Sequence, residues 1–492
     1  MPHRPYNTDI TLILPAQKNL SIMEQIHNIV NTVQNFLWSY INIELLILCA
    51  LYFTWRTGFV QFRLLGEMFR IVMHSDKSDS KAEDTGMKHI SSFHAFIVAL
   101  ASRIGTGNMA GVATAICVGG PGAVFWMWVM ALFGAATAFV ESTLAQLYKR
   151  RGALNFYGGP AYYMLHGLKK KWMGVIFSLL MILTFGFANN AMQSNTIALA
   201  WKQAFSIPTE YMGALLCVLT MAIIFGGIQR VAKVSALVVP VMAVVYLALS
   251  LYVVAANISL LPSVFRLIIE DAFGMRQVTG ATFGTIVMMG IKRGLFSNEA
   301  GEGSAPNAAA TASVAHPVKQ GLIQALGVFS DTLIVCSCTA FVILCSSVDV
   351  TQSNGVELTQ NALSSVIGPI GAPLIAVMIW MFAFSTIIAN CYYGETNLQF
   401  FTSNRQALVA YRLTACLFVM GGSLIGLDLA WSFIDLCMAL ITICNLIAIL
   451  WLYPKVDFLV RDYMSQRKAG RAPVFNSSKM PDDAADLEAW DE

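Results

Sequence analysis

The sequence predicts an all-α integral membrane protein with eleven transmembrane helices, two of them broken. Of its 492 residues, 57% are hydrophobic and 12% are charged, against roughly 45–50% and about 25% in a soluble globular chain. The apolar residues come in runs of about twenty or more, enough for a helix to cross a hydrocarbon core of roughly 30 Å. Two of these runs carry glycines and charges near their centres, where a continuous helix in lipid is unfavourable.

Eleven apolar runs define the predicted spans. They lie at 36–55, 92–118, 122–148, 173–201, 211–228, 234–256, 279–312, 320–347, 371–396, 408–427 and 430–453. Residues 21–35 carry apolar residues at helical spacing, so they form either an interfacial helix or the solvated start of the first span. The polar residues 466–492 end in an acidic stretch and have the composition of a disordered tail.

The chain therefore divides into five predicted parts. A periplasmic or interfacial segment (1–35) precedes an extra transmembrane helix (36–55), two sets of five helices (92–256 and 279–453) and a polar cytoplasmic tail (454–492).

The basic residues predict the orientation. Counted in alternate connections, Lys and Arg number 23 on one side of the membrane and five on the other. Because cytoplasmic loops carry the positive excess, we expect the N-terminus outside and the C-terminus in the cytoplasm, in the cell inner (plasma) membrane. The net charge is only +3, so nothing favours a nucleic-acid partner, and no obligate protein partner is evident.

The sequence gives little support to an enzyme or a channel. Neither H-E-x-x-H nor G-x-S-x-G occurs, and the histidines fall mainly in loops or near predicted helix ends. The ten cysteines lie mostly inside apolar runs, and Cys336 and Cys338 lack zinc-site spacing, so we interpret them as core residues. Residues 1–20 lack the pattern of a removed signal peptide. A channel would need a repeated selectivity filter rather than two unequal breaks.

The first break falls in the second span, between Ala101 and Gly111. This stretch reads ASRIGTGNMAG. Each glycine costs about 1 kcal/mol in a helix interior, and a central Arg costs roughly 2.5–3.5 kcal/mol on insertion scales. Gly107 and Gly111 also have the spacing of a close helix contact, but that alternative does not account for Asn108 at the same depth.

The second break falls in the seventh span, between Lys292 and Pro306. The stretch KRGLFSNEAGEGSAP holds four charges, three glycines and a proline. A break leaves backbone N–H and C=O groups unpaired, and a bound ion or zwitterion can satisfy them where lipid cannot. The N-terminal end of a half-helix favours a carboxylate, and exposed carbonyls favour a hard cation such as Na⁺.

The two broken spans are five apart, so each begins a set of five. Because five is odd, the two sets must run in opposite senses across the membrane. This is the inverted repeat of many secondary transporters, whose discontinuous helices meet at the midplane.

Five sequence blocks accompany these breaks in a fixed order. They are GTGNMAGVA at 105–113, GGPGAVFWMW at 119–128, GGP at 158–160, LFSNEAG at 295–301 and AHPVKQG at 315–321. Together they resemble the alanine or glycine:cation symporter family, also called sodium:alanine symporters, over about residues 36–460. The resemblance implies a LeuT-type 5+5 inverted repeat. It also implies uptake of a small neutral amino acid with Na⁺, or in some members H⁺, and no cofactor or other metal.

The substrate site is expected at the two breaks. The half-helix argument places the backbone of Thr106, Gly107 and Asn108 against the substrate carboxylate. In the seventh span, Phe296 would form a wall of the pocket, and Ser297, Asn298 and Glu299 offer oxygens to the ammonium group or the ion. The resemblance adds Gln193 as a substrate contact. Alternatively, Glu299 pairs with Arg103 as a structural or gating charge.

The resemblance suggests that the cation binds the carbonyls of Ala101 and Ile104 with the hydroxyls of Ser385 and Thr386, beside Asn108. The alternative for the Ser-Thr pair is a bond to its own helix backbone. Three further acidic residues lie at membrane depth, and we interpret each as a helix-to-helix contact: Glu141, Asp331 and Glu395.

Asn390 departs from the family pattern. After FSTI at 384–387 the commonest pattern continues with Gly-Trp, whereas this chain has Ala389-Asn390. A missing Trp leaves a larger and more polar space, so a larger neutral amino acid such as glutamine or serine is an alternative substrate. A same-fold amino-acid exchanger is a further alternative to symport.

Overall fold

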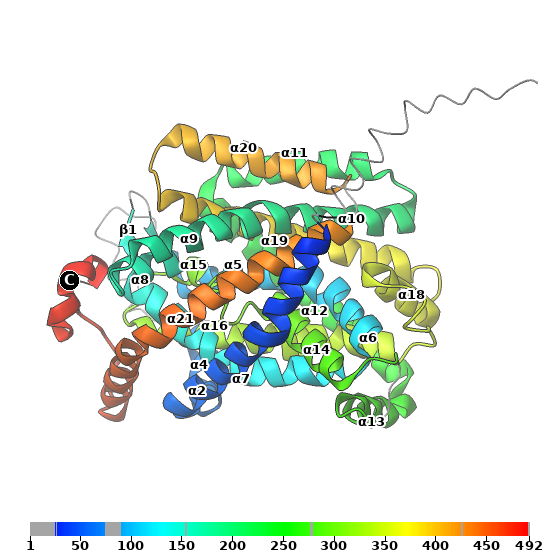
Figure 1. Ribbon diagram of the computed structural model, residues 1–492, viewed down its shortest axis with the longest axis horizontal. Coiled ribbons are helices and arrows are strands. Elements are labelled where there is room, and N and C mark those ends of the chain that lie inside the picture. Colours follow the sequence, from blue (N-terminus) through cyan, green and yellow to red (C-terminus); the bar gives the residue numbers. More distant parts are fainter. Residues whose placement is uncertain are drawn as a thin grey trace, which may run out of the picture.

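The computed structural model describes residues 25, 27–73, 90–152, 155–275, 279–424 and 427–490, and these ranges are almost entirely helical (Figure 1). The α-helices are α2 (Ile43–Arg56), α3 (Val60–Arg63), α4 (Leu65–Met73), α5 (Ser92–Arg103), α6 (Val112–Gly119), α7 (Ala123–Leu147), α8 (Pro160–His166), α9 (Lys171–Met181), α10 (Asn189–Phe205), α11 (Thr209–Ile224), α12 (Gly227–Ala256), α13 (Leu261–Ala272), α14 (Phe283–Asn298), α15 (Pro306–Ala309), α16 (Pro317–Val328), α17 (Ser337–Leu344), α18 (Gly355–Ile367), α19 (Gly371–Gln399), α20 (Arg405–Gly422) and α21 (Leu427–Lys468). Within those ranges, the one sheet pairs β1 (Arg150–Arg151) antiparallel with β2 (Phe156–Tyr157).

Seven of the described helices are long and apolar enough to cross a membrane, and eight if one bent pair counts as a single span. The seven are His27–Arg56, Ala123–Leu147, Lys171–Phe205, Gly227–Ala256, Pro317–Leu344, Gly371–Gln399 and Trp431–Lys468, and the bent pair joins Ser92–Arg103 to Gly107–Gly119 at 47°. The remaining predicted runs contain the shorter helices α11, α14 and α20. The protein is therefore a multi-pass membrane protein.

Residues 27–35 continue directly into the first long helix, which runs from His27 to Arg56. They are thus the start of that helix rather than a separate interfacial one. The signal-peptide expectation for residues 1–20 lies outside the described residues.

Several long helices contain π-helical turns, in which the backbone hydrogen bonds skip one extra residue. These are η1 (Trp38–Asn42), η3 (Gly107–Gly111), η4 (Ile182–Ala188) and η6 (Phe329–Cys336). Such turns are rare and frequently mark functional sites. Here η3 belongs to the first break, η6 holds Asp331, and η4 directly precedes α10, which carries Gln193.

Two amphipathic helices lie outside the predicted spans. α13 contacts α7, where the carboxylate of Asp271 accepts a 2.7 Å hydrogen bond from the Gly122 N–H. The indole of Trp126 in α7 also donates to the Ala272 carbonyl. α18 packs beside α19 and the first break. In Figure 1 these two helices lie at the lower and right edges of the bundle.

The disorder predicted for residues 466–492 is wrong for their described part. After α21 the chain forms three 3₁₀ turns, η7 (Ser477–Lys479), η8 (Pro481–Asp486) and η9 (Glu488–Trp490), beside β1 and α8 in Figure 1. Three apolar anchors, Phe475, Leu487 and Trp490, are buried. The Trp490 indole donates to the carbonyls at the end of α7 at 3.2 and 3.1 Å.

Charge pairs also hold this tail. The Asp486 carboxylate contacts Lys169 and lies 3.1 Å from Nδ1 of His166. Partial burial raises the pKa of Asp486, but its hydrogen bonds and charge interactions with Lys169 and His166 outweigh burial and keep that pKa below its usual range. An acid-rich composition therefore serves here to bind a basic surface.

Candidate functional site

The first break separates α5 from η3. α5 ends at Arg103, and Ile104 leaves the helical region with φ −78° and ψ 86°. The freed N–H groups find side-chain acceptors. The Gly105 N–H donates to Oδ1 of Asn108 at 2.9 Å, and the Thr106 N–H donates to Oε1 of Gln193 at 3.0 Å. Two side-chain amide oxygens thus accept hydrogen bonds from the backbone N–H groups at the start of the second half-helix.

Three of the predicted cation ligands lie together at this break. The Thr386 hydroxyl, from α19, lies 2.9 Å from the Ala101 carbonyl oxygen and 3.3 Å from that of Ile104. Gly105 permits this approach, because a Cβ there would lie 2.4 Å from Oγ1 of Thr386. The own-backbone contact expected as the alternative is present for both residues, because the hydroxyls of Thr386 and Ser385 lie 3.1 and 2.8 Å from the Phe382 carbonyl oxygen. In the described residues only Thr386 also reaches the carbonyls of the break.

The second break follows α14. Glu299 adopts a left-handed conformation with φ 57°, and Gly301 and Gly303 also have positive φ, of 99° and 80°. The buried carboxylate of Glu141 accepts hydrogen bonds from the Gly301 and Gly303 N–H groups at 3.3 and 3.1 Å. It also accepts one from the Asn445 amide at 2.7 Å. Glu141 therefore links α7 and α21 to the unwound chain and satisfies its donors.

Asp331 joins the two breaks. Its Oδ1 accepts a 2.6 Å hydrogen bond from the Asn108 amide, and its Oδ2 accepts a 2.7 Å bond from the Ser297 hydroxyl. Asp331 is fully buried in η6. The sequence marked it as a helix-to-helix contact, and the geometry places that contact between the predicted substrate-binding residues of both broken spans.

Arg103 and Glu299 form no ion pair in the described part of the chain. The Glu299 carboxylate accepts hydrogen bonds from the hydroxyls of Ser102 and Ser304, each at 2.6 Å. Arg103 donates instead to Gln324, to the carbonyl at 3.1 Å and to Oε1 at 3.2 Å. The alternative of a direct lock between these two charges is therefore not formed in this conformation.

The other predicted substrate residues surround the same region. Phe296 packs against the first break, because a Cβ on Gly107 would lie 3.1 Å from its ring. The Asn298 amide donates to the Thr332 hydroxyl at 3.2 Å. The Ser102 hydroxyl oxygen lies 2.8 Å from Oδ1 of Asn390. Within the described residues, Nδ2 of Asn390 and Oγ1 of Thr106 are buried without a hydrogen-bond partner.

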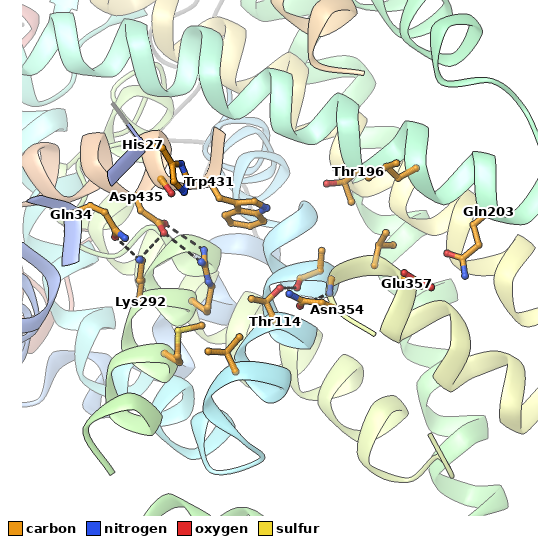
Figure 2. A pocket seen from close by; sticks show the side chains of 18 of the residues that line it. His27, Gln34, Thr114, Thr196, Gln203, Lys292, Asn354, Glu357, Trp431 and Asp435 are labelled. Atoms are coloured by element: carbon orange, nitrogen blue, oxygen red, sulfur yellow. Dashed lines mark hydrogen bonds and ion pairs between the residues drawn. The ribbon is translucent and has the colours of Figure 1, made fainter. Parts of the chain in front are cut away.

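A cavity of about 870 Å³ opens above this region (Figure 2). Ala110 and Thr114, just beyond the first break, line it, as does Trp431 of α21. The Trp431 ring lies 5.2 Å from that of Phe296, centroid to centroid. Phe296 thus lies between Trp431, in the cavity wall, and Gly107 of the first break, and we call this cavity the vestibule.

Comparisons with known proteins confirm the family resemblance found in the sequence. A family model described as the sodium:alanine symporter family matches residues 23–477. The chain is 48% identical to the amino-acid carrier protein AlsT of Bacillus subtilis over 471 residues, 96% of this chain and 99% of that protein. It is 46% identical over 455 residues to the probable sodium/glutamine symporter GlnT of the same organism, covering 92% and 94% of the two chains.

A solved structure shows the fold. The crystal structure of MhsT in complex with L-phenylalanine matches with a TM-score of 0.54 at 14% identity, over 82% of this chain and 94% of that one. With the family model and close relatives covering nearly the whole length, the chain belongs to the sodium:alanine symporter family, which consists of transporters rather than enzymes.

Proposed function

We propose that the protein imports a small neutral amino acid, such as alanine or glycine, by symport with Na⁺. The observation that carries this proposal is the contact of the Thr386 hydroxyl with the carbonyls of Ala101 and Ile104. Hard cations prefer such neutral oxygens at a helix break. When Na⁺ enters, the hydroxyl rotates its proton away and offers a lone pair, so the three oxygens share the ion.

The same break supports a carboxylate site. The N–H groups of Gly105 and Thr106 now donate to the amide oxygens of Asn108 and Gln193. A substrate carboxylate binds by replacing an amide oxygen, because a charged acceptor forms the stronger hydrogen bond. Its ammonium group then faces the oxygens of Ser297 and Asn298. A bound Na⁺ nearby favours the carboxylate, which couples the two ligands.

The proposed architecture has eleven spans. His27–Arg56 is the extra helix, and the remaining spans form two inverted sets of five that begin with the broken helices. The 23-to-five distribution of basic residues supports an N-terminus outside and a C-terminus in the cytoplasm, and the inner (plasma) membrane is the proposed location. In this orientation the vestibule opens outward, since it is lined by residues at the start of the first helix.

A second candidate substrate is a larger neutral amino acid such as glutamine. Asn390 replaces the bulky side chain expected at its position, and its buried Nδ2 has no partner within the described residues. The relative GlnT is named a probable sodium/glutamine symporter. Two alternatives to Na⁺ symport are symport with H⁺ and exchange of one amino acid for another.

Uptake into proteoliposomes tests the proposal. Labelled alanine should accumulate only with an inward Na⁺ gradient, and equal accumulation with no Na⁺ or H⁺ gradient would contradict symport. Accumulation driven by an H⁺ gradient alone would identify the proton as the coupling ion. Competition by unlabelled amino acids decides the substrate: competition by alanine and glycine alone would refute the larger pocket.

A further inference from the structure

The outer vestibule contains a buried cluster of charges that the proposed transport site does not use. Figure 2 shows Lys292, Asp435 and Gln34 together at one end of the cavity, opposite Glu357 and Gln203. Nζ of Lys292 lies 2.6 Å from Oδ2 of Asp435 and 2.8 Å from Oε1 of Gln34. Arg293 also faces Asp435, but at 3.5 Å. The side chains of Lys292, Arg293 and Asp435 are only 7%, 8% and 5% exposed.

This cluster has more positive than negative charge. It holds two cations and one carboxylate, and that carboxylate already makes a short contact with Lys292. Arg293 donates from Nη1 and Nη2 to the two oxygens of Asp435, but both hydrogen bonds are 3.5 Å long, against about 2.7–2.9 Å for a typical charge-assisted bond. Its Nε has no hydrogen-bond partner in the described residues. A buried guanidinium with a free donor is unfavourable unless an anion compensates it.

The surroundings of Arg293 suit an amino acid. The guanidinium lies over the Trp431 ring, 4.4 Å from its centroid, which keeps the planar fork in one orientation. Below it, Trp431 contacts Phe296, the residue next to the first break. A zwitterion adds no net charge to the cluster, but it can place its carboxylate on Arg293 and its ammonium group on Asp435, so that each of its charges faces an opposite one.

We propose that Arg293, Lys292 and Asp435 form an outer binding site for the carboxylate of the arriving amino acid, one aromatic layer above the transport site. This inference rests on the proposed function for the identity of the ligand. The site requires no Na⁺, because no part of it lies at the Ala101–Thr386 contact. It raises the local substrate concentration beside Phe296 and Trp431.

Equilibrium binding tests this site without transport. Labelled alanine is titrated into the purified full-length protein in a buffer free of Na⁺ and Cl⁻. The variants are Arg293→Gln and the control Lys202→Gln, since Lys202 lines the same cavity but is exposed and outside the cluster. Arg293→Gln leaves the Lys292–Asp435 pair balanced, so we expect it to fold, and its melting temperature checks this. Arg293→Lys is a second variant, which keeps the positive charge but lacks the planar guanidinium with its paired N–H donors.

We expect Na⁺-independent alanine binding in the wild type and in Lys202→Gln, at least tenfold weaker binding in Arg293→Gln, and an intermediate value in Arg293→Lys. Alanine methyl ester, which lacks the carboxylate, should not compete. Chloride should compete if the cluster recognises anions in general. The proposal would be overturned if the wild type bound chloride but not alanine. It would also be overturned if Arg293→Gln bound alanine as tightly as the wild type.

The variant Thr386→Ala separates this inference from the proposed function. It should require a much higher Na⁺ concentration for uptake and keep Na⁺-free binding unchanged. If the wild type shows Na⁺-free binding but no gradient-driven uptake, the proposed function fails while the outer site stands. If the wild type shows Na⁺-driven uptake but no Na⁺-free binding, the outer site fails while the proposed function stands.

Discussion

Replacing Gly105 by Ala should weaken Na⁺ binding without unfolding the protein. The added methyl carbon would lie 2.4 Å from Oγ1 of Thr386 and 3.0 Å from Oε1 of Gln193, whereas ordinary contact begins near 3.4 Å. The Thr386 hydroxyl must therefore move by about 1 Å. That displacement takes it away from the carbonyls of Ala101 and Ile104, which are the atoms proposed to share the ion.

The size of the effect follows from the overpacking. Forcing one extra carbon into a packed site costs roughly 1–3 kcal/mol, and a change of this size in one ligand's affinity is about 5- to 150-fold. The Na⁺ concentration for half-maximal alanine uptake should rise by that factor, with a smaller change in maximal rate. Gly421→Ala is the matched control, because nothing lies within 4 Å of the Cβ it adds.

A double-mutant cycle decides whether the effect passes through Thr386. If it does, Gly105→Ala combined with Thr386→Ala should require no more Na⁺ than Thr386→Ala alone, since the displaced hydroxyl is already absent. Strict additivity of the two changes, or an unaltered Na⁺ requirement in Gly105→Ala, would refute the assignment of the cation site.

Three further predictions concern other parts of the molecule. Glu141→Gln should lower the melting temperature strongly, because Glu141 accepts two hydrogen bonds from the second break and one from Asn445 of α21. Glu302→Gln should be tolerated, because both oxygens of that buried carboxyl lack partners in the described residues; equal losses would contradict this account. Trp490→Ala should expose the tail to trypsin at residues 469–490 while uptake stays Na⁺-dependent, and an unchanged digestion rate would show that the indole does not hold the tail. Asn390→Trp should make alanine uptake insensitive to competition by glutamine, and undiminished competition would refute its role in pocket size.

The sequence predicted the two breaks well because their chemistry is local. Glycines, charges and a proline inside apolar runs are unfavourable wherever a helix faces lipid, so their positions alone locate the unwound chain. The family resemblance then paired Thr386 with the carbonyls of Ala101 and Ile104, which are about 285 positions away in the chain. No periodicity could have matched residues so far apart.

The role of Asp331 could not be foreseen from the sequence. A single Asp in an apolar run indicates a buried partner, but the run does not show which face of the helix meets which neighbour. The π-turn η6 also changes that face relative to a regular α-helix. The contact of Asp331 with Asn108 and Ser297 therefore depends on tertiary packing that sequence spacing does not encode.

The tail was misjudged for a different reason. Its acidic composition is typical of disorder, but Phe475, Leu487 and Trp490 supply apolar anchors and the basic surface near α8 supplies counter-charges. A few well-spaced aromatic residues in an acidic segment were the available signal. Average composition conceals them because they are few.

The π-turns give this protein a way to change shape without a hinge. Each inserts one surplus residue into a helix, and moving that surplus along the backbone by a single step turns the intervening side chains by about 100° around the axis. Of the π-turns named above, η3 forms part of the first break, and η6 packs against η3 and α14. Asn108 lies in η3 and Asp331 lies in η6. A shift of either π-turn by one residue would rotate that side chain away from the site while the helix axis stays in place.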